Sequence, residues 1–263
     1  MLPYNGQLLL AVCTTAGEKM VTAILSALPE EQAGLSALLA NKEAIQHAGR
    51  SFLRGTIHQQ PAILALSGTG KVAAATTATA LIERFGAAQI IFTGVAGGLG
   101  EGVQVGDLVI GTRYVQHDMD VSPLFPRFVV PSLGKAILDA DATLIAMFLI
   151  AACALHKRAA GQKHYLKSFQ IHQGLIASGD RFVSSVAEVR ALRASLPDAL
   201  CVEMEGAAVA QVCHDYGIPF AAVRTISDRA DDTAHTDFSA FVKEVAGPVA
   251  TSLITAFFAP QVD

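Results

Sequence analysis

The feature that most constrains the fold is a repeated change between short, continuous apolar runs and helical segments. Runs such as "PAILALSG" and "PFAAVRTISD" lack the polar–apolar alternation of a strand with one wet face. Continuous apolar strands are typical of sheets that helices cover on both faces. The 263 residues, of which 52% are hydrophobic, suit one large α/β domain over residues 1–263, although two small domains are not excluded.

The expected elements alternate along most of the chain. Strands are expected at 7–13, 61–68, 87–100, 105–117, 169–180, 199–205 and 219–228. Helices are expected at 18–28, 71–86, 134–156, 184–197, 206–217 and 237–258. The sequence therefore predicts an α/β fold with a sheet between two layers of helices.

Polar residues and glycines gather where the expected strands end. They are Glu18, Ser67–Lys71, the loop Gly94–Gly98, Asp180, Glu203 with Glu205, and Asp228. Acids in a first helical turn offset the helix dipole by roughly 0.3–1 kcal/mol each, so capping is one interpretation. Ligands of open α/β sheets bind beyond the carboxyl ends of the strands. Because the same pattern recurs at so many strand ends, a ligand site is the better interpretation.

Charge and composition exclude several classes of protein. The net charge is −4 and no basic run with aromatics occurs, which argues against a nucleic-acid binder. The longest apolar stretch, Thr143 to Leu155, is well short of the ~20 residues that a membrane span needs. Four scattered cysteines indicate reduced thiols, and "MLPYNGQLLLAVC" suggests a first strand rather than a signal peptide. We therefore expect a cytoplasmic protein.

Three short motifs carry little weight alone. "TGVAGGLG" lacks the spacing of a dinucleotide fingerprint, and "SGTGK" lacks the hydroxyl residue that completes a phosphate loop. "HDMD", His117 to Asp120, has no second cluster to share a metal, so a polar loop is expected. We therefore expect neither a cofactor nor a metal ion.

Arg224 and Asp228 lie at the end of the apolar run "PFAAVRTISD". A buried arginine needs an anionic partner, because an isolated charge is costly to desolvate. Glu18 or Glu205 could supply it. A purely structural ion pair is the alternative.

Several segments resemble one enzyme family in the same order along the chain. "VEMEGAAVAQVCHDYGIPFAAVRTISDRAD" is similar to the signature of 5′-methylthioadenosine/S-adenosylhomocysteine nucleosidases, within the purine-nucleoside and uridine phosphorylase superfamily. "SGTGKVAAA", "FTGVAGGLGEGVQVGDLVI" and "LIASGDRFV" match further family segments. The resemblance is weak over 121–168. It implies a single domain with a central mixed, twisted sheet, and hydrolysis of 5′-thio-substituted adenosines without a cofactor.

The resemblance also implies roles for individual residues. Glu205 would accept hydrogen bonds from the ribose, Met204 would pack on it and Glu203 would help orient it. Asp228 would protonate the purine at N7, while Phe182 stacks on the base and backbone around Val183 reads its edge. Glu18 would activate water at the end of the first strand, and Arg224 would help hold that water. The loop residues Val95, Ala96 and Gly97 would line the substrate pocket.

The chemistry of glycosidic cleavage calls for these residue types independently. Positive charge develops on the sugar, so carboxylates near the ribose stabilise the transition state. A purine leaves readily only when it is protonated, and general acid–base help is typically worth about 10²–10⁴-fold per group. Glu203 and Glu205 are therefore expected to face a ribose.

Phosphate is not expected as the nucleophile. Phosphorylases of the superfamily place arginine and a hydroxyl residue where this chain has Phe92 and Val95, and "TTAGEKM" offers no arginine. A dianion needs such donors. The chain also departs from the nucleosidases, which usually have a serine at the place of Val95 and an acid-rich run at the place of "TAGEK".

Two further classes remain open. One is a phosphorylase, or a hydrolase of another 5′-modified nucleoside such as futalosine. The other is a non-catalytic nucleoside-binding or storage protein, against which the joint presence of Glu205 and Asp228 argues. The resemblance implies a homo-oligomer, commonly a dimer, in which the segment Asp120 to Phe128 would close the 5′ end of the neighbouring pocket. Leu124 and Phe125 are its expected contacts, unless they pack on their own subunit.

Overall fold

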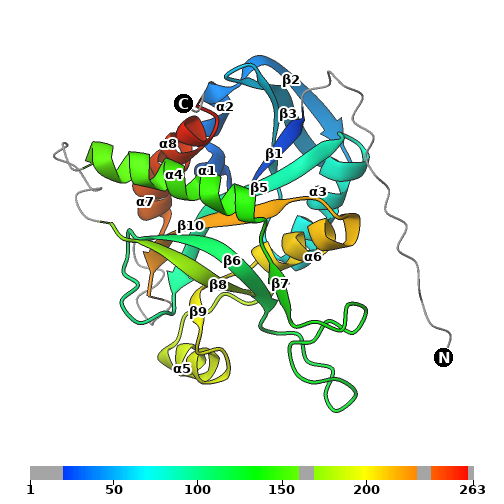
Figure 1. The fold of residues 1–263 in the computed structure, drawn as a ribbon, viewed down its shortest axis with the longest axis vertical. Coiled ribbons are helices and arrows are strands. Elements are labelled where there is room, and N and C mark those ends of the chain that lie inside the picture. Colours follow the sequence, from blue (N-terminus) through cyan, green and yellow to red (C-terminus); the bar gives the residue numbers. More distant parts are fainter. Residues whose placement is uncertain (1–19, 160–168, 230–237, 260–263) are drawn as a thin grey trace.

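The fold is built around one mixed sheet. The computed structural model describes residues 20–159, 169–229 and 238–259. Within these residues, ten strands form a sheet with helices on both sides (Figure 1). The strands are β1 (Val21–Ser26), β2 (Ala40–His47), β3 (Arg50–Ile57), β4 (Gln60–Leu66), β5 (Ala87–Gly98), β6 (Leu108–Gln116), β7 (Ile137–Asp139), β8 (Ile171–Ser178), β9 (Ala199–Glu203) and β10 (Phe220–Asp228).

The long strand β5 organises the sheet. It pairs in parallel with β1 and with β10, and its last residues pair antiparallel with β9. The path β5–β10–β6–β8–β9 returns to β5, so these strands close on themselves. Register brings three strand ends together, because Gly97 lies opposite Asp228 of β10 and opposite Val202 of β9. The carboxyl ends of β5, β9 and β10 therefore meet at one place.

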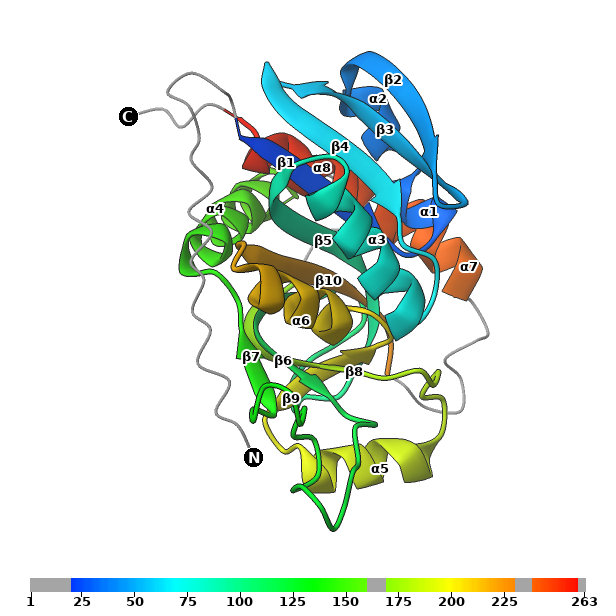
Figure 2. The same ribbon diagram turned by 90° about the vertical axis from the view of Figure 1, so that its right-hand side faces the viewer.

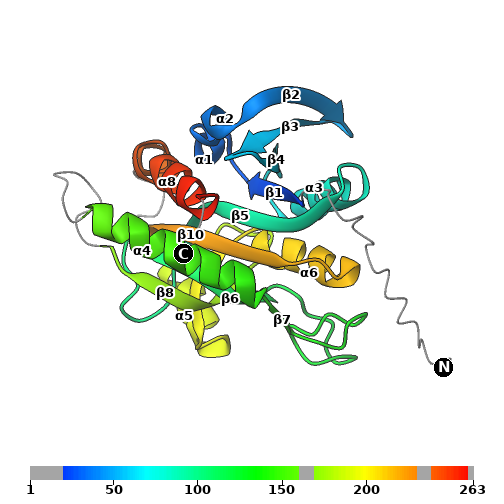
Figure 3. The ribbon, with the colours of Figure 1, turned by 45° about the horizontal axis from the view of Figure 1, so that its top comes forward.

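Helices cover the two faces of the sheet. They are α1 (Pro29–Gln32), α2 (Leu35–Leu38), α3 (Lys71–Glu83), α4 (Ala142–Ala159), α5 (Val186–Ser195), α6 (Gly206–Tyr216), α7 (Phe238–Phe241), the π-helix η1 (Val242–Ala246) and α8 (Gly247–Phe257). Figure 2 shows α3 and α6 side by side on one face, and Figure 3 shows α4 and α8 together on the other. The helix α5 lies beside β8 and β9 at one end.

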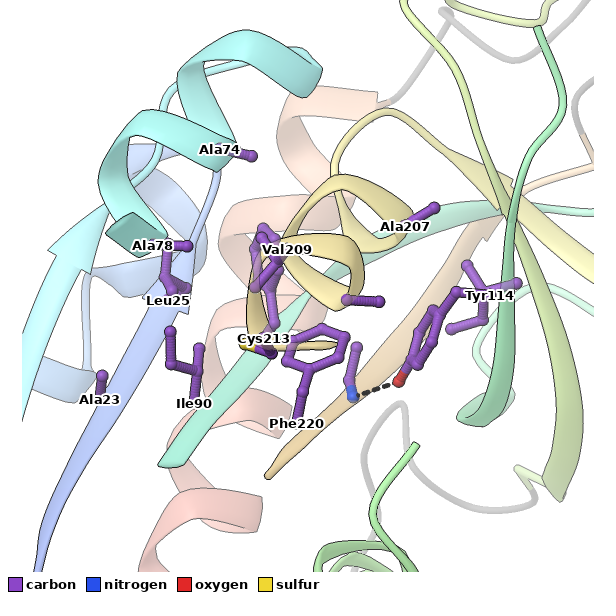
Figure 4. Close-up of a cluster of buried hydrophobic side chains, with 14 of the residues drawn as sticks. Ala23, Leu25, Ala74, Ala78, Ile90, Tyr114, Ala207, Val209, Cys213 and Phe220 are labelled. Atoms are coloured by element: carbon purple, nitrogen blue, oxygen red, sulfur yellow. Dashed lines mark hydrogen bonds between the residues drawn. The ribbon is translucent and has the colours of Figure 1, made fainter. Parts of the chain in front are cut away.

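Alternate residues of each strand point to different layers. Ala23 and Leu25 of β1 pack with Ala78 of α3 and Val209 of α6 (Figure 4), whereas Ile24 joins the cluster of α4 and α8. Side chains alternate across a strand, so a strand between two helical layers must be apolar throughout. The expected sheet with helices on both faces is confirmed.

The structure differs from the sequence expectation in three places. Residues 18–28 were expected to be helical, but β1 occupies Val21–Ser26. The β2–β3 hairpin was not predicted, and β7 lies inside the segment 134–156 that was expected to be helical. Short apolar runs fit either period, and only pairing with β4 and β5 decides that "VTAILS" is a strand. The strand expected at 7–13 lies outside the described residues.

The helices of the described segments are too short or too polar to serve as membrane spans. The helix α4, which contains the whole of the longest apolar stretch, packs on α8 and on β6.

Candidate active site

A pocket of about 360 Å³ lies where the strand ends meet. Its walls come from the segment after β1, the loop before α3, the end of β5, the segment after β8, the β9–α6 junction and the end of β10. The lining residues are Ala27, Leu28, Glu31, Thr69, Val95, Ala96, Gly97, Arg181, Phe182, Val183, Val202, Glu203, Met204, Glu205, Ser227 and Asp228. The structure thus brings together most of the residues singled out in the sequence.

Arg224 forms a buried ion pair behind this pocket. Its Nη2 donates to Oε2 of Glu203 at 2.6 Å, and its guanidinium lies 4.1 Å from the ring centroid of Phe92. Among the described residues the ion-pair partner of Arg224 is therefore Glu203 and not the expected Glu205, while Glu18 lies outside the described residues. Glu203 is the last residue of β9, and its side chain reaches Arg224 of β10, which like β9 pairs with β5.

The carboxylate of Glu203 is occupied by protein donors. Besides Arg224, it accepts hydrogen bonds from the Ser178 hydroxyl and from the Gly206 N–H at 2.9 Å. The side chain lines the pocket, but these donors fix its orientation. The Glu203–Arg224 ion pair therefore has a structural role, which was the alternative interpretation of the sequence. Glu203 also lines the pocket, where a ligand would bind.

Glu205 is held differently. It precedes α6, and its Oε1 accepts the Gly70 N–H at 2.7 Å. Burial, and next the charge of Glu203, raise its pKa to about 8, while the Gly70 hydrogen bond and Arg224 act in the opposite direction. At neutral pH this carboxyl therefore carries a proton most of the time.

Glu31 is a third pocket carboxyl, and sequence reasoning missed it. It is 3% exposed, and it accepts the N–H groups of Ala27 and Leu28 at 2.8 and 2.9 Å and that of Val95 at 3.0 Å. Burial raises its pKa, which Arg224 opposes. Glu18 lies outside the described residues, and it precedes β1. Of the two acids that follow the first described strand, Glu30 and Glu31, it is Glu31 that lines the pocket.

A sequence signal for Glu31 was present. "VTAILS" contains the β-branched residues that favour strands, and "ALPEEQ" follows it directly. Reading 21–26 as the first strand would have placed an acidic pair at its carboxyl end.

The residues that were expected to bind the base and the sugar line the same pocket. Asp228 ends β10 and accepts the Ser227 hydroxyl at 2.7 Å. Phe182 is 47% exposed and lines the pocket next to Val183, and Met204 lies between the two glutamates in sequence. An aromatic face, a carboxyl and an apolar thioether on one pocket suit a flat base joined to a polar ring.

The segment Asp120 to Phe128, which was expected to close the pocket of a neighbouring subunit, does not line the pocket of its own chain. Leu124 is 79% exposed and Phe125 is 40% exposed. The alternative in which both pack on their own subunit fails for Leu124.

An ion pair joins two short motifs of the sequence, "HDMD" and "SGTGK". In "HDMD", His117 is buried against Gly179, and Asp118 pairs with Lys71 of "SGTGK" at 2.6 Å. Among the described residues, no group of three or more histidine, cysteine or acidic side chains is arranged to hold a metal ion.

The closed mixed sheet and its pocket of carboxyls at converging strand ends define an α/β enzyme of the nucleoside phosphorylase class. The model of the phosphorylase superfamily matches residues 21–259. The chain is 38% identical to a 5′-methylthioadenosine/S-adenosylhomocysteine nucleosidase of Anoxybacillus flavithermus, over 86% of this chain and 93% of that protein. The chain therefore belongs to the phosphorylase superfamily, and within it to the family of these nucleosidases.

Solved structures agree. The nucleosidase of Neisseria meningitidis, in complex with methylthio-immucillin-A, superposes with a TM-score of 0.82 at 36% identity, covering 90% of this chain and 97% of that one. The futalosine hydrolase of Helicobacter pylori gives a TM-score of 0.80 at 33% identity, with the same coverage. Both structures therefore have the same fold as this chain.

Proposed function

We propose that the protein hydrolyses the N-glycosidic bond of 5′-thio-substituted adenosines, namely methylthioadenosine and S-adenosylhomocysteine, and releases adenine. The observation that carries this proposal is the placement of Glu31, Glu205 and Asp228 around one pocket. Membership of the nucleosidase family supports the choice of substrate. The three carboxyls supply three different needs of the reaction.

Glu205 and Met204 would receive the ribose. The Gly70 N–H occupies one oxygen of Glu205, so the other oxygen is available for a ribose hydroxyl. Glu203 would help to orient the ribose, and its negative charge lies near the sugar, where positive charge develops in the transition state. Its ion pair with Arg224 keeps that charge in place.

Phe182, Val183 and Asp228 would receive the base. The half-exposed ring of Phe182 offers a face for stacking, and backbone groups around Val183 can read the edge of the purine. Asp228, at the end of β10, would protonate N7. The loop residues Val95, Ala96 and Gly97 complete the wall between base and sugar.

We assign the activation of water to Glu31. A Cβ built on Gly94 would lie 2.8 Å from Oε1 of Glu31 and 3.1 Å from Nη1 of Arg224, so both groups meet above this glycine. Nη1 of Arg224 has no hydrogen-bond partner among the described residues. A water between a carboxyl of raised pKa and this donor could be both held and deprotonated.

Water rather than phosphate is the proposed nucleophile. Phe92 is fully buried beneath the Arg224 guanidinium, and Val95 presents its backbone N–H to Glu31. Neither side chain can donate a hydrogen bond to a phosphate dianion. Glu31 would also repel such an anion when it is ionised.

Futalosine is the second candidate substrate, because the futalosine hydrolase is as similar in fold as several nucleosidases. Product analysis distinguishes the 5′-thio-substituted adenosines from futalosine as substrates. Methylthioadenosine, S-adenosylhomocysteine, adenosine and futalosine are incubated with the protein, with and without phosphate. We expect adenine and a free thio-sugar without any effect of phosphate. A sugar-1-phosphate product, or cleavage of futalosine alone, would contradict the proposal.

We further propose a homo-oligomer, most simply a dimer, in the cytoplasm. The exposed Leu124 and Phe125 support an apolar contact to a second subunit. Among the described cysteines, Cys201 and Cys213 are buried and Cys153 is exposed, and all three are free thiols, as suits a reducing compartment.

A further inference from the structure

Three loops that follow three different strands are tied together beside the pocket. The loop after β4 leads into Lys71, the first residue of α3, while the loop after β6 carries Asp118 and the loop after β8 carries Asp180. We call these three residues the clasp. None of them lines the pocket, and none has a role in the proposed reaction.

The hydrogen bonds of the clasp form a closed ring. The Nζ of Lys71 donates to Oδ1 of Asp118 at 2.6 Å, and the N–H of Asp180 donates to Oδ2 of Asp118 at 2.9 Å. The N–H of Lys71 donates to Oδ1 of Asp180 at 2.7 Å, which completes the ring. Although partial burial opposes them, these donors lower the pKa of Asp118. The ring is therefore built for an ionised Asp118.

The ring borders the pocket on two sides. Gly70 precedes Lys71 and donates its N–H to Glu205 at 2.7 Å. Arg181 and Phe182 follow Asp180 and line the pocket. Gly70 has a φ of +95°, and a Cβ there would lie 3.0 Å from Oδ1 of Asp180, so the close approach of the two loops requires glycine. The clasp thus fixes the position of a donor to Glu205 and of the Phe182 segment together.

We propose that Lys71, Asp118 and Asp180 are positioning residues that hold the Gly70 N–H against Glu205 and thereby set the protonation of that carboxyl and its grip on the ribose. The ribose part of this inference rests on the proposed function. The link between clasp and Glu205 does not, because it concerns the protein without substrate.

Other charged groups around Glu205 are not part of the clasp. They are Glu203 at the end of β9, Arg224 on β10 and Glu31 on α1, and each of them acts on the pKa of Glu205. Within the described residues none of them is hydrogen-bonded to a clasp residue. Lys71→Met removes a positive charge and Asp118→Asn removes a negative one, so a rise of the Glu205 pKa in both variants reports on the Gly70 N–H rather than on the lost charge.

Lys71→Met removes the ammonium that closes the ring and keeps a long apolar side chain. Lys71→Arg keeps the charge and serves as the rescue. The matched control is Asp198→Asn, which breaks the exposed ion pair of Asp198 with Arg113 at 3.9 Å, away from the pocket. Asp118→Asn preserves shape and gives a second test if Lys71→Met does not fold.

The first readout is the titration of Glu205 by NMR in protein labelled with ¹³C at the glutamate carboxyls, with the signal assigned from Glu205→Gln. Because a hydrogen bond to the ionised form is lost, we expect the midpoint to rise by about one pH unit in Lys71→Met and Asp118→Asn. Lys71→Arg and Asp198→Asn should titrate as the parent does. An unchanged midpoint in folded Lys71→Met overturns the proposal.

The second readout is kinetic and uses methylthioadenosine. In Lys71→Met, kcat/KM should fall about tenfold, with its pH profile displaced in the same direction as the Glu205 midpoint. A parent protein that cleaves no nucleoside contradicts the proposed function, yet the titration still decides the clasp. A midpoint that rises while kcat/KM and its pH profile stay at parent values overturns the ribose part alone.

Discussion

The protonation of Glu205 gives a stability prediction that needs no substrate. Its pKa is raised from 4.5 to about 8 in the folded protein, chiefly by burial and secondly by the charge of Glu203. Between these two values the folded protein holds a proton that the unfolded chain has released. The contribution of Glu205 to the free energy of unfolding is therefore fully present below about pH 4.5. It falls as pH rises towards 8, at about 1.4 kcal/mol per pH unit for one proton.

Glu205→Gln removes this titration while keeping the shape and the acceptor for the Gly70 N–H. The parent protein should lose about 3–4 kcal/mol relative to the variant between pH 5 and pH 8. Glu31 also has a raised pKa, but it is present in both proteins, so its effect cancels in the difference apart from its weaker interaction with Glu205. At pH 8 Glu205→Gln should be the more stable protein.

The assay is urea unfolding followed by far-UV circular dichroism at one protein concentration from pH 5 to pH 8, because the chain contains no tryptophan. Glu43→Gln, an exposed substitution on β2, is the control and should follow the parent. Parallel stability curves for the parent and Glu205→Gln would refute the reasoning. A difference that widens as pH falls would refute its sign.

Three further predictions concern turnover. Asp228→Asn keeps its shape but cannot protonate N7, so turnover should fall at least about 10²-fold with unchanged unfolding, and near-parental turnover would contradict the assignment. Glu31→Gln should likewise reduce kcat by about 10²-fold or more, whereas Glu18→Gln should not; the reverse pattern would restore Glu18 as the base. Serine at both Leu124 and Phe125 should raise KM for methylthioadenosine more than for adenosine, because each apolar contact can be worth roughly 1.5–3 kcal/mol. Equal changes in KM, or a monomer by sedimentation at working concentration, would speak against the closing role.

Much of the fold could be predicted because β4, β5, β9 and β10 are largely apolar, and because α3, α5 and α6 follow β4, β8 and β9 as separate helices with clear ends. Gly86 and Gly217 illustrate this, since both adopt the positive φ at which helices commonly end. The strand β1 was predicted as part of a helix because a short apolar run such as 21–26 fits either period. Its pairing with β4 and β5 shows that it is a strand.

The same misassignment placed the expected water-activating acid at Glu18. Glu31, which we propose for this role, follows β1 and lines the pocket. Spacing along the chain could not identify it, because the carboxyl is fixed by the N–H groups of Ala27, Leu28 and Val95. Val95 lies on β5, far away in sequence.

The pair Glu203 and Glu205 shows why residue type alone could not settle the partner of Arg224. Side chains two apart share a face of a continuing strand, so both acids would face the same way. The strand ends at Glu203, however, and Glu205 adopts φ −137° and ψ −38° as the chain turns into α6. Glu203 consequently meets Arg224 on β10, and Glu205 meets Gly70 before α3. The two carboxyls therefore have different surroundings: Glu203 is ion-paired with Arg224, whereas burial and next the charge of Glu203 raise the pKa of Glu205.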